Sequence, residues 1–535
     1  MRFYDNLTRS EAIAAVLRLG ESEANLLDKN QYLSVYDVGA YDKTIIADAL
    51  LNQPSDLPEP SQSALPASWK GAGLSARKDG RHFYKEFQES DIAFLAENGF
   101  NFTRVFFGFS TLRYPDFPAD EKLINKTELE DMDKLIAWGI RYGVHIQLSM
   151  CGIPNGKESF DVDDREWEMI RAYWEALAKR YAAIPSRYLS FDLVNEIFPR
   201  EESNFDRAVA WMARINADIH TASPQRVTLV SHPGNPNMEW AEAMAKAGIA
   251  IGCHPYMPTY MADGNDQTLY QTAEVYWPYP YFPSVLQPGE SLTISGDIGG
   301  NALLMDFWVY QPFTVTFDNG QKQTIQVQGD YKDDMSFGWR FKKPLSVSIP
   351  SGVKRLTIHV TQNSFTLNEL GLTDKAGQVR WIVPHDFFEG SAVGGTDLNW
   401  NAAKGWGSEK ACTADYIFTQ KIQPLLSLAK EYNVGMMCNE FGIFACNMNG
   451  WKVATIVAYT NDMLKIFEKH NIPWSLCEAE GFPYRFLTMP VKTYITYEWK
   501  GATLKQHTYT FPDGHSRQLY VCEELLNVFR RHLPK

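Results

Sequence analysis

Two glutamates follow short apolar runs, and each stands directly after an asparagine. One pair is Asn195-Glu196 and the other is Asn439-Glu440. Cleavage of a glycosidic bond needs two carboxyl groups, one to protonate the leaving oxygen and one to attack the sugar or activate water. The sequence therefore predicts acid–base chemistry of this kind, provided that the fold brings Glu196 and Glu440 together.

The apolar runs that carry these glutamates belong to a regular alternation, which begins near residue 69. Short runs rich in apolar residues, typical of buried parallel strands, alternate with longer amphipathic runs. Eight short runs are predicted as strands: Trp69–Leu74, Phe102–Phe106, His145–Met150, Leu189–Val194, Arg226–Val230, Ile249–Cys253, Val434–Cys438 and Ile472–Leu476.

The longer runs predict helices. In residues 164–181 and 204–220, apolar residues recur at spacings of three and four, which places them on one helical face, and residues 453–466 repeat the pattern. Eight strands alternating with helices predict an α/β fold, the (β/α)8 TIM barrel. The strand C-termini form the active end of such a barrel, so Glu196 on strand four and Glu440 on strand seven would face each other across its mouth.

An open doubly wound sheet is the alternative fold. It usually carries a Gly-rich phosphate-binding turn after its first strand. The run 69–73 contains Gly-Ala-Gly but no third glycine, and no clear helix follows it. This absence favours the barrel.

A long segment between strands six and seven has a different period. From residue 267 to 387, apolar residues alternate with a period of two, and turns such as 318–320 separate the short runs. We expect an antiparallel β-sandwich, similar to carbohydrate-binding modules, inserted into the barrel. The barrel would then comprise residues 69–266 and 388–535.

The two ends of the chain are expected to pack on this barrel. Residues 1–68 predict an arm with one helix at Ser10–Leu19. Near the other end, Thr493–Trp499 and Thr508–Phe511 predict a hairpin, and Cys522–His532 predicts a closing helix.

The composition excludes several classes of partner. The 535 residues include 51 Lys and Arg against 64 Asp and Glu, so the formal charge is −13 and polyanions such as nucleic acid or an anionic membrane are repelled. No apolar stretch reaches the length of a membrane span. Aromatic residues make up 13% of the chain, which suits a sugar-binding cleft.

The seven cysteines and the first residues bear on location. No C-x-x-C pair occurs, so neither a zinc site nor a redox pair is indicated, and most cysteines lie in apolar runs as small hydrophobic residues do. We expect a cytoplasmic protein because no signal peptide is visible at Met1; a secreted protein with its signal removed is the alternative.

Four motifs together give the sequence a family resemblance. The Asn-Glu pair ending strand four and the run Glu440-Phe441-Gly442 after strand seven resemble those of glycoside hydrolase family 5, a clan of retaining barrels. The resemblance covers residues 69–535 apart from the insertion. It implies that Glu440 is the nucleophile, that Glu196 is the acid/base, and that Asn195 holds the sugar 2-hydroxyl.

The other two motifs imply supporting roles at the same site. The segment Gly99–Val105 is similar to the strand-two motif of the family, whose arginine, here Arg104, lies under the nucleophile. His254-Pro255-Tyr256 is similar to the His-x-Tyr of strand six. Arg104 would keep Glu440 ionised, and the hydroxyl of Tyr256 would orient its carboxylate.

The sequence departs from the family at the subsites. Strand three ends without the usual histidine, and Cys477 aligns where strand eight usually supplies a tryptophan, with Trp474 three residues earlier. Trp474 and Glu478 are candidates for substrate binding, Glu478 through a sugar hydroxyl. Trp406, on a Gly-rich segment with Trp400, is a candidate sugar platform, with loop packing as the alternative.

The resemblance predicts a retaining glycoside hydrolase acting on a β-glucan, a β-mannan or a related β-glycoside. The alternative is an inactive barrel that serves as a glycan-binding protein. No cofactor is implied, because carboxylates alone perform the reaction. No metal site is predicted, since the 11 histidines include neither His-x-His nor His-Glu-x-x-His. The sugar, exo or endo action, and the oligomeric state stay open.

Overall fold

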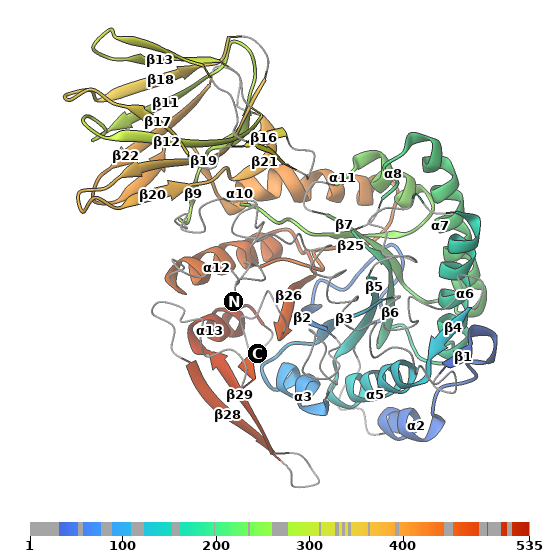
Figure 1. The fold of residues 1–535 in the computed structure, drawn as a ribbon. Coiled ribbons are helices and arrows are strands. Elements are labelled where there is room, and N and C mark those ends of the chain that lie inside the picture. Colours follow the sequence, from blue (N-terminus) through green and yellow to red (C-terminus); the bar gives the residue numbers. More distant parts are fainter. Residues whose placement is uncertain are drawn as a thin grey trace, which may run out of the picture.

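The computed structural model describes most of the chain, and its central element is a parallel barrel (Figure 1). The described residues are 32–51, 57–75, 88–108, 122–151, 161, 163–196, 198–233, 236–258, 276–309, 312–326, 331–333, 338–340, 344–361, 364–390, 395–442, 453–480, 489–490, 504–510 and 516–533. Eight parallel strands form the barrel in the order β2 (Lys70–Ser75), β3 (Phe102–Gly108), β5 (His145–Cys151), β6 (Leu189–Asn195), β7 (Thr228–His232), β8 (Ala250–Cys253), β25 (Met436–Met437) and β26 (Trp474–Glu480).

The barrel closes between its seventh and eighth strands. Cys438 and Trp474 form a parallel bridge there, and the backbone N–H of Ser475 donates to the carbonyl of Cys438 at 2.8 Å. All eight apolar runs therefore form strands in the predicted order, and the predicted TIM barrel is confirmed.

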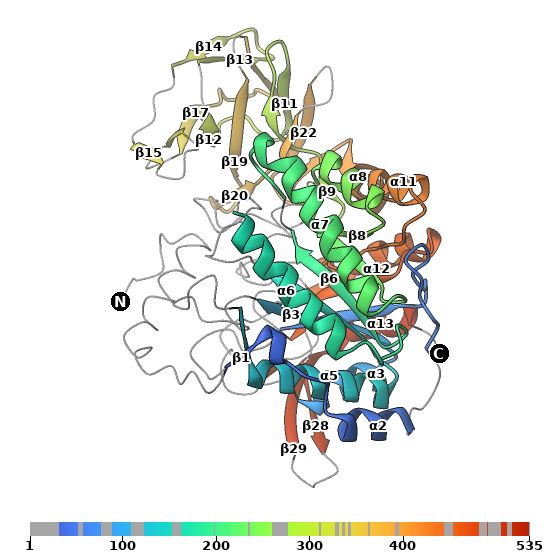
Figure 2. The same ribbon diagram turned by 90° about the vertical axis from the view of Figure 1, so that its right-hand side faces the viewer.

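Helices follow the strands and cover the outside of the barrel (Figure 2). Their bounds are α3 (Glu89–Glu97), α5 (Lys126–Tyr142), α6 (Asp164–Arg180), α7 (Glu202–Ala222), α8 (Met238–Lys246), α10 (Ala414–Ile417), the π-helix η5 (Phe418–Ile422), α11 (Gln423–Glu431), α12 (Val453–Lys469) and α13 (Glu523–His532). The start of α6 shows why a helix forms at this point. The side chain of Asp163 accepts from the N–H groups of Arg165 and Glu166, and Glu166 bonds back to the backbone of Asp163.

The insertion is a β-sandwich that stands as a separate body beside the barrel (Figure 1). One six-stranded sheet contains β17 (Leu345–Ser348), β12 (Ala302–Val309), β19 (Phe365–Thr373), β20 (Val379–Ile382), β10 (Pro283–Leu286) and β21 (Asp386–Gly390). The other contains β14 (Lys322–Ile325), β13 (Phe313–Phe317), β18 (Arg355–His359), β11 (Ser291–Gly296), β22 (Thr396–Asn401) and β23 (Gly405–Ser408). Beside them, β15 (Tyr331–Asp333) and β16 (Gly338–Arg340) pair with each other.

The sandwich ends later than residue 387, where the sequence placed its boundary. β22 pairs in parallel with β11, and β23 pairs with β22, so the chain leaves the sandwich only after Ser408. The predicted boundary is too early because the glycines around β23 favour a loop over a strand in the sequence. A short ladder of β9 (Tyr279–Pro280) and β24 (Ala411–Cys412) then joins the sandwich to the barrel. We call this ladder, together with the ion pair between Asp386 of β21 and Lys421 of η5, the neck.

The described part of the N-terminal arm packs on the barrel helices. β1 (Tyr32–Ser34) pairs with β4 (Leu123–Asn125) and leads into the 3-10 helix η3 (Val35–Asp37), and α2 (Lys43–Leu51) packs against α5. The predicted helix at 10–19 lies outside the described residues.

The C-terminal part adds a small sheet to the barrel. β27 (Met489–Pro490), β28 (Leu504–Thr510) and β29 (Ser516–Cys522) form it ahead of α13, and the predicted strand at 493–499 lies outside the described residues. No helix within the described ranges has the length and apolar character that a bilayer crossing requires.

Candidate active site

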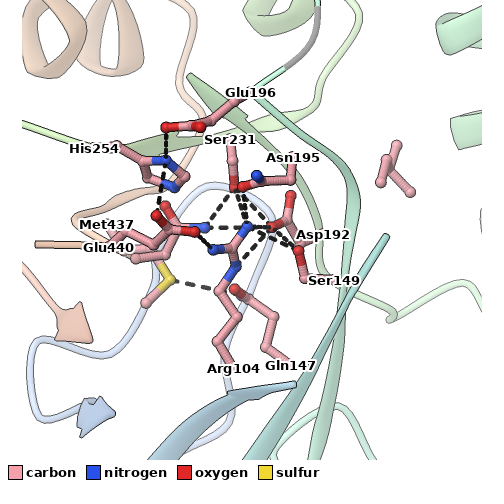
Figure 3. Close-up of polar contacts among 12 residues, drawn as sticks. Arg104, Gln147, Ser149, Asp192, Asn195, Glu196, Ser231, His254, Met437 and Glu440 are labelled. Carbon is pink, nitrogen blue, oxygen red and sulfur yellow. Dashed lines mark hydrogen bonds and ion pairs between the residues drawn. The ribbon is translucent and has the colours of Figure 1, made fainter. Parts of the chain in front are cut away.

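Glu196 and Glu440 meet at the C-terminal end of the barrel (Figure 3). Glu196 directly follows β6, and Glu440 follows β25 by three residues. One carboxylate oxygen of each lies within 4.8 Å of the other. This separation matches the roughly 5–5.5 Å between the carboxyl groups of retaining glycosidases and is shorter than the roughly 6.5–9.5 Å of inverting ones.

The carboxylate of Glu440 is buried and held from both sides. Arg104, on β3, donates through Nη1 to Glu440 Oε1, and the hydroxyl of Tyr256 donates to Oε2 at 2.5 Å. Burial alone would raise the pKa of Glu440, but the charges of His254 and Arg104 and these hydrogen bonds outweigh it and lower the pKa below its usual value. Glu440 is therefore ionised at neutral pH, as a nucleophile must be.

Arg104 is itself fixed by a second carboxylate inside the barrel. Its Nε and Nη2 donate to Asp192 Oδ2 at 2.9 and 2.5 Å, and its Nη2 also reaches the hydroxyls of Ser149 and Ser231. Both hydroxyls donate in turn to Asp192 Oδ2 at 2.7 Å. All four side chains are fully buried, so the guanidinium has one orientation, with Nη1 directed at Glu440.

Glu196 differs from Glu440 in its backbone and its exposure. Its φ is 54°, in the left-handed region, and its N–H donates to the carbonyl of Ser231 at 3.0 Å. A non-glycine residue holds this conformation only where the surroundings fix it, and such residues concentrate at active sites. Its side chain is 29% exposed, so it can meet a substrate and exchange a proton with water.

Two more of the predicted residues, His254 and Asn195, lie beside the carboxylates. His254 Nδ1 shares a hydrogen bond with Glu196 Oε1 at 2.6 Å and lies 3.5 Å from Glu440 Oε2. Asn195 Oδ1 accepts from Arg104 Nη2 at 2.7 Å, which fixes the amide next to the acid/base candidate. The structure thus brings Arg104, Asn195, His254 and Tyr256 together around the two glutamates.

Two predicted tryptophans lie elsewhere. Trp406 is on β23 in the sandwich, 4% exposed, and its Nε1 donates to the carbonyl of Arg380. Trp474 begins β26, is fully buried, and packs against the rings of Phe441 and Phe529. A tryptophan that stacks on a sugar needs an exposed ring face, so the predicted substrate-binding roles of Trp406 and Trp474 are corrected to core packing.

The third subsite candidate, Glu478, lies on β26. Its side chain is outside what the structure describes.

Several residues of the site were not predicted. Ser149, Asp192 and Ser231 each lie within an apolar strand and point into the barrel, and Asn439 donates to Ser231 Oγ at 2.6 Å. Each interrupts an otherwise apolar run with a polar side chain, and that interruption was the available signal. Cys477 was noted only as a departure, yet its Sγ lies 3.5 Å from Glu440 Oε2.

Glu196, His254 and Glu440 are also the group within the described ranges whose donor atoms lie close enough to hold a metal ion. Arg104 and Tyr256 already bond both oxygens of Glu440, and the buried guanidinium would repel a second cation at that distance. The donor set therefore fits the two-carboxylate chemistry better than a metal site.

Comparisons with known proteins agree with the site. Residues 62–281 match the family model "Cellulase (glycosyl hydrolase family 5)". Over 197 residues the chain is 24% identical to a probable glucan 1,3-beta-glucosidase A of Emericella nidulans, covering 35% of this chain and 47% of that protein. Over 241 residues it is 26% identical to endoglucanase 3 of Fibrobacter succinogenes, covering 42% of this chain and 35% of that protein. The matches thus span less than half of either relative.

Similar solved structures include two that overlap most of the chain. One is a glycoside hydrolase with 15% identity and a TM-score of 0.49, covering 87% of this chain and 100% of that one. The other is an endoglucanase of Pseudomonas stutzeri in complex with cellobiose, with 12% identity and a TM-score of 0.42, covering 90% and 96%. Residues 62–281, which include most of the barrel strands and Glu196, are thus similar to the glycosyl hydrolase family 5 model, and the placement of Glu196 and Glu440 agrees with that similarity.

Proposed function

We propose that the protein is a retaining glycoside hydrolase that cleaves β-glycosidic bonds of a β-glucan, a β-mannan or a related β-glycoside. The observation that carries the proposal is the pair Glu196 and Glu440, with oxygens within 4.8 Å at the mouth of the barrel. The two curated relatives are named for a glucan glucosidase and an endoglucanase, which favours a β-glucan among these substrates.

In the first step, the carboxylate of Glu440 bonds to the anomeric carbon of the sugar. The bond from that carbon to the leaving oxygen breaks, and Glu196 gives its proton to this oxygen. Arg104 and Tyr256 hold the attacking carboxylate in one orientation, so little reorganisation is needed when the bond forms. Glu196 is partly exposed, so a leaving group can reach its carboxyl group.

In the second step, water replaces the enzyme on the sugar. Glu196, now a carboxylate, takes a proton from the water while the oxygen of that water bonds to the anomeric carbon. The electron pair of the ester bond returns to Glu440, whose charge Arg104 then stabilises. Each of the two displacements inverts the anomeric centre, so the product keeps the configuration of the substrate.

A trapping experiment tests the proposal directly. A 2-deoxy-2-fluoro aryl β-glycoside slows both steps, and the second step more, so the glycosyl-enzyme accumulates. We expect mass spectrometry to find the added sugar on Glu440, and NMR of the reaction on an unmodified substrate to show a β-anomer as the first product. Glu440→Gln is the matched control, because it keeps the side-chain size and removes the nucleophile.

Two outcomes would contradict the proposal. Silence on aryl β-glycosides and on polysaccharides, together with retained glycan binding, would favour the alternative of an inactive glycan-binding barrel. An α-anomer as first product would instead show inversion and contradict the double displacement.

A further inference from the structure

The thiol of Cys477 lies against the carboxylate of Glu440. Its Sγ is 3.5 Å from Glu440 Oε2, and the side chain is 4% exposed. A thiol is a weak hydrogen-bond donor, and an ionised carboxylate is a strong acceptor, so the S–H group donates and the carboxylate accepts. The same oxygen accepts from the hydroxyl of Tyr256, and the other oxygen accepts from Arg104.

The backbone fixes the thiol relative to this carboxylate. The N–H of Cys477 donates at 2.9 Å to the carbonyl of Phe441, the residue that follows Glu440. On the other side, the carbonyl of Cys477 packs so closely on Gly73 that a Cβ there would lie 1.9 Å from it. The strand that carries Cys477 is thus held between the loop of the nucleophile and β2, at the seam where the barrel closes.

We propose that Cys477 is a positioning residue that donates its S–H to Glu440 Oε2 and stabilises this carboxylate as it leaves the sugar. The inference rests on the proposed function, because it concerns the second step of the same reaction. It gives a role to the residue at which the chain departs from the tryptophan expected on strand eight.

The two chemical steps should respond to this hydrogen bond in opposite ways. In the first step the carboxylate loses its charge as it bonds to the anomeric carbon, so a donor that stabilises this charge favours the starting state and slows the step slightly. In the second step water bonds to the same carbon, its proton goes to Glu196, and the electron pair returns to Glu440. The S–H group stabilises the charge that reappears, and it therefore speeds this step.

Cys477→Ala removes the donor, and Cys477→Ser retains one. Both are compared with wild type on a dinitrophenyl β-glycoside, whose good leaving group makes the first step fast. For Cys477→Ala we expect kcat and KM to fall together by about 3-fold, the size of one weak hydrogen bond, while kcat/KM near neutral pH stays within about 2-fold of wild type. The burst of dinitrophenol should become more pronounced.

The pH profile gives a second readout that a purely structural role would not move. Without the donor, the acid limb of kcat/KM should move upward by roughly half a pH unit, because one unit corresponds to about twice that hydrogen-bond energy. Cys477→Ser should restore the limb and the burst at least in part. Cys522→Ala is the matched control, since Cys522 is a buried cysteine at the N-cap position of α13, and it should leave both unchanged.

Three results would overturn the inference. An alanine variant with an unchanged burst and acid limb shows that the thiol is not a donor that matters. A fall in kcat/KM with unchanged KM shows a displaced nucleophile. Equal defects in the serine and alanine variants show a packing role. If the alanine variant does not fold, the pair Cys477→Thr and Cys477→Val makes the same comparison at equal size.

The activity of the wild-type protein distinguishes a failure of the proposed function from a failure of this inference. If wild type itself releases no dinitrophenol from the β-glucoside, the β-cellobioside or the β-mannoside, the proposed function fails and the role of Cys477 falls with it. If wild type is active and only the variants behave unexpectedly, the inference about Cys477 fails alone.

Discussion

Buried ion pairs between a basic side chain and a carboxylate occur in two regions of the protein, the mouth of the barrel and the neck of the sandwich. At the mouth, Arg104 contacts both Asp192 and Glu440. At the neck, Lys421 Nζ lies 2.6 Å from Asp386 Oδ2, with side chains 9% and 3% exposed. At the mouth Arg104 thus contacts two carboxylates, whereas at the neck Lys421 is described in contact with one. Buried carboxylates are costly, and the mouth holds Glu440 where the proposed reaction uses it as the nucleophile.

The two clusters also differ in the elements that build them. The mouth draws its side chains from the ends of parallel strands, which the barrel holds at fixed spacing. The neck joins β21 of the sandwich to the π-helix η5, which runs between α10 and α11. A π-helix is a local irregularity in a helix. Here the side chain of Lys421 bonds to Asp386 of the sandwich, and the backbone carbonyl of Lys421 accepts from the thiol of Cys253 on β8. The neck therefore fixes the sandwich to the barrel, and it contains no group that the reaction needs.

The largest expected effect concerns the two glutamates of the mouth. Glu196→Gln removes the acid/base and should lower kcat on polysaccharide by about 10²–10⁴-fold. Glu440→Gln removes the nucleophile and should lower kcat further still. Circular dichroism should show an unchanged fold in both, because glutamine keeps the size of the side chain. Near-normal activity in both variants would contradict the mechanism.

The second prediction tests whether the extra carboxylate serves to position Arg104. Asp192→Asn removes the charge that holds Nε and Nη2, so the guanidinium can turn away from Glu440. We expect kcat/KM to fall roughly 10²-fold and the free energy of unfolding to fall by about 3–5 kcal/mol.

Ser149→Ala is the matched control for this variant. It removes one of the hydroxyl groups that donate to Asp192 and keeps the charge, so its effect on both quantities should be clearly smaller. If Asp192→Asn retained wild-type kcat/KM, Asp192 would be a structural residue like Asp386.

The third prediction concerns variants that remove the ion pair of the neck and leave the residues of the mouth unchanged. Lys421→Met or Asp386→Asn alone leaves a buried charge without this partner and should lower the free energy of unfolding by about 3–5 kcal/mol. The double variant Lys421→Met with Asp386→Leu should recover most of that loss, because apolar side chains tolerate burial. Thermal or urea unfolding measures the cycle, and kcat at 25 °C should stay within about 2-fold of wild type. A large loss of kcat in the double variant would show that the sandwich orientation matters to the site.

The same contrast explains what could be predicted from the sequence. Parallel strands buried on both faces read as continuous apolar runs, and this made all eight barrel strands visible, even β25 with its two residues. For the same reason the alternation of inward and outward side chains is hidden in them. Ser149 and Asp192 lie inside two of the predicted strands, where the pattern predicts no role for them, although both bond to Arg104.

The tryptophans show a second limit of the sequence. A tryptophan that stacks under a sugar and a tryptophan in the core look the same in a sequence, and only the exposure of the ring distinguishes them. Trp400 and Trp406 face each other across β22 and β23 with ring centroids 5.0 Å apart, so the alternation that buries Leu398 also buries them. The flanking glycines suggested a loop because glycine is rare in strands, but Gly405 has a φ of 88° at the turn of a hairpin.

The smallest expected effect is a dependence of stability on pH that belongs to the mouth. His232, on β7 beside Ser231, is fully buried, and neither ring nitrogen has a hydrogen-bond partner. Burial, with the nearby charge of His254, lowers the pKa of His232 from 6.5 to about 3. Between these values the unfolded chain binds a proton that the native state does not, so native stability falls as the pH falls from 6.5 towards 3.

The loss amounts to at most about 1.4 kcal/mol for each pH unit in that window, and none is expected from this group above it. His232→Leu should flatten this part of the curve of unfolding free energy against pH. Urea denaturation from about pH 4.5, inside the window, to about pH 7.5, above it, measures the difference. The neck double variant has lost only a lysine and an aspartate and should keep the slope. An unchanged slope in His232→Leu would mean that His232 takes up its proton in the native state as readily as in the unfolded chain, and it would contradict this prediction.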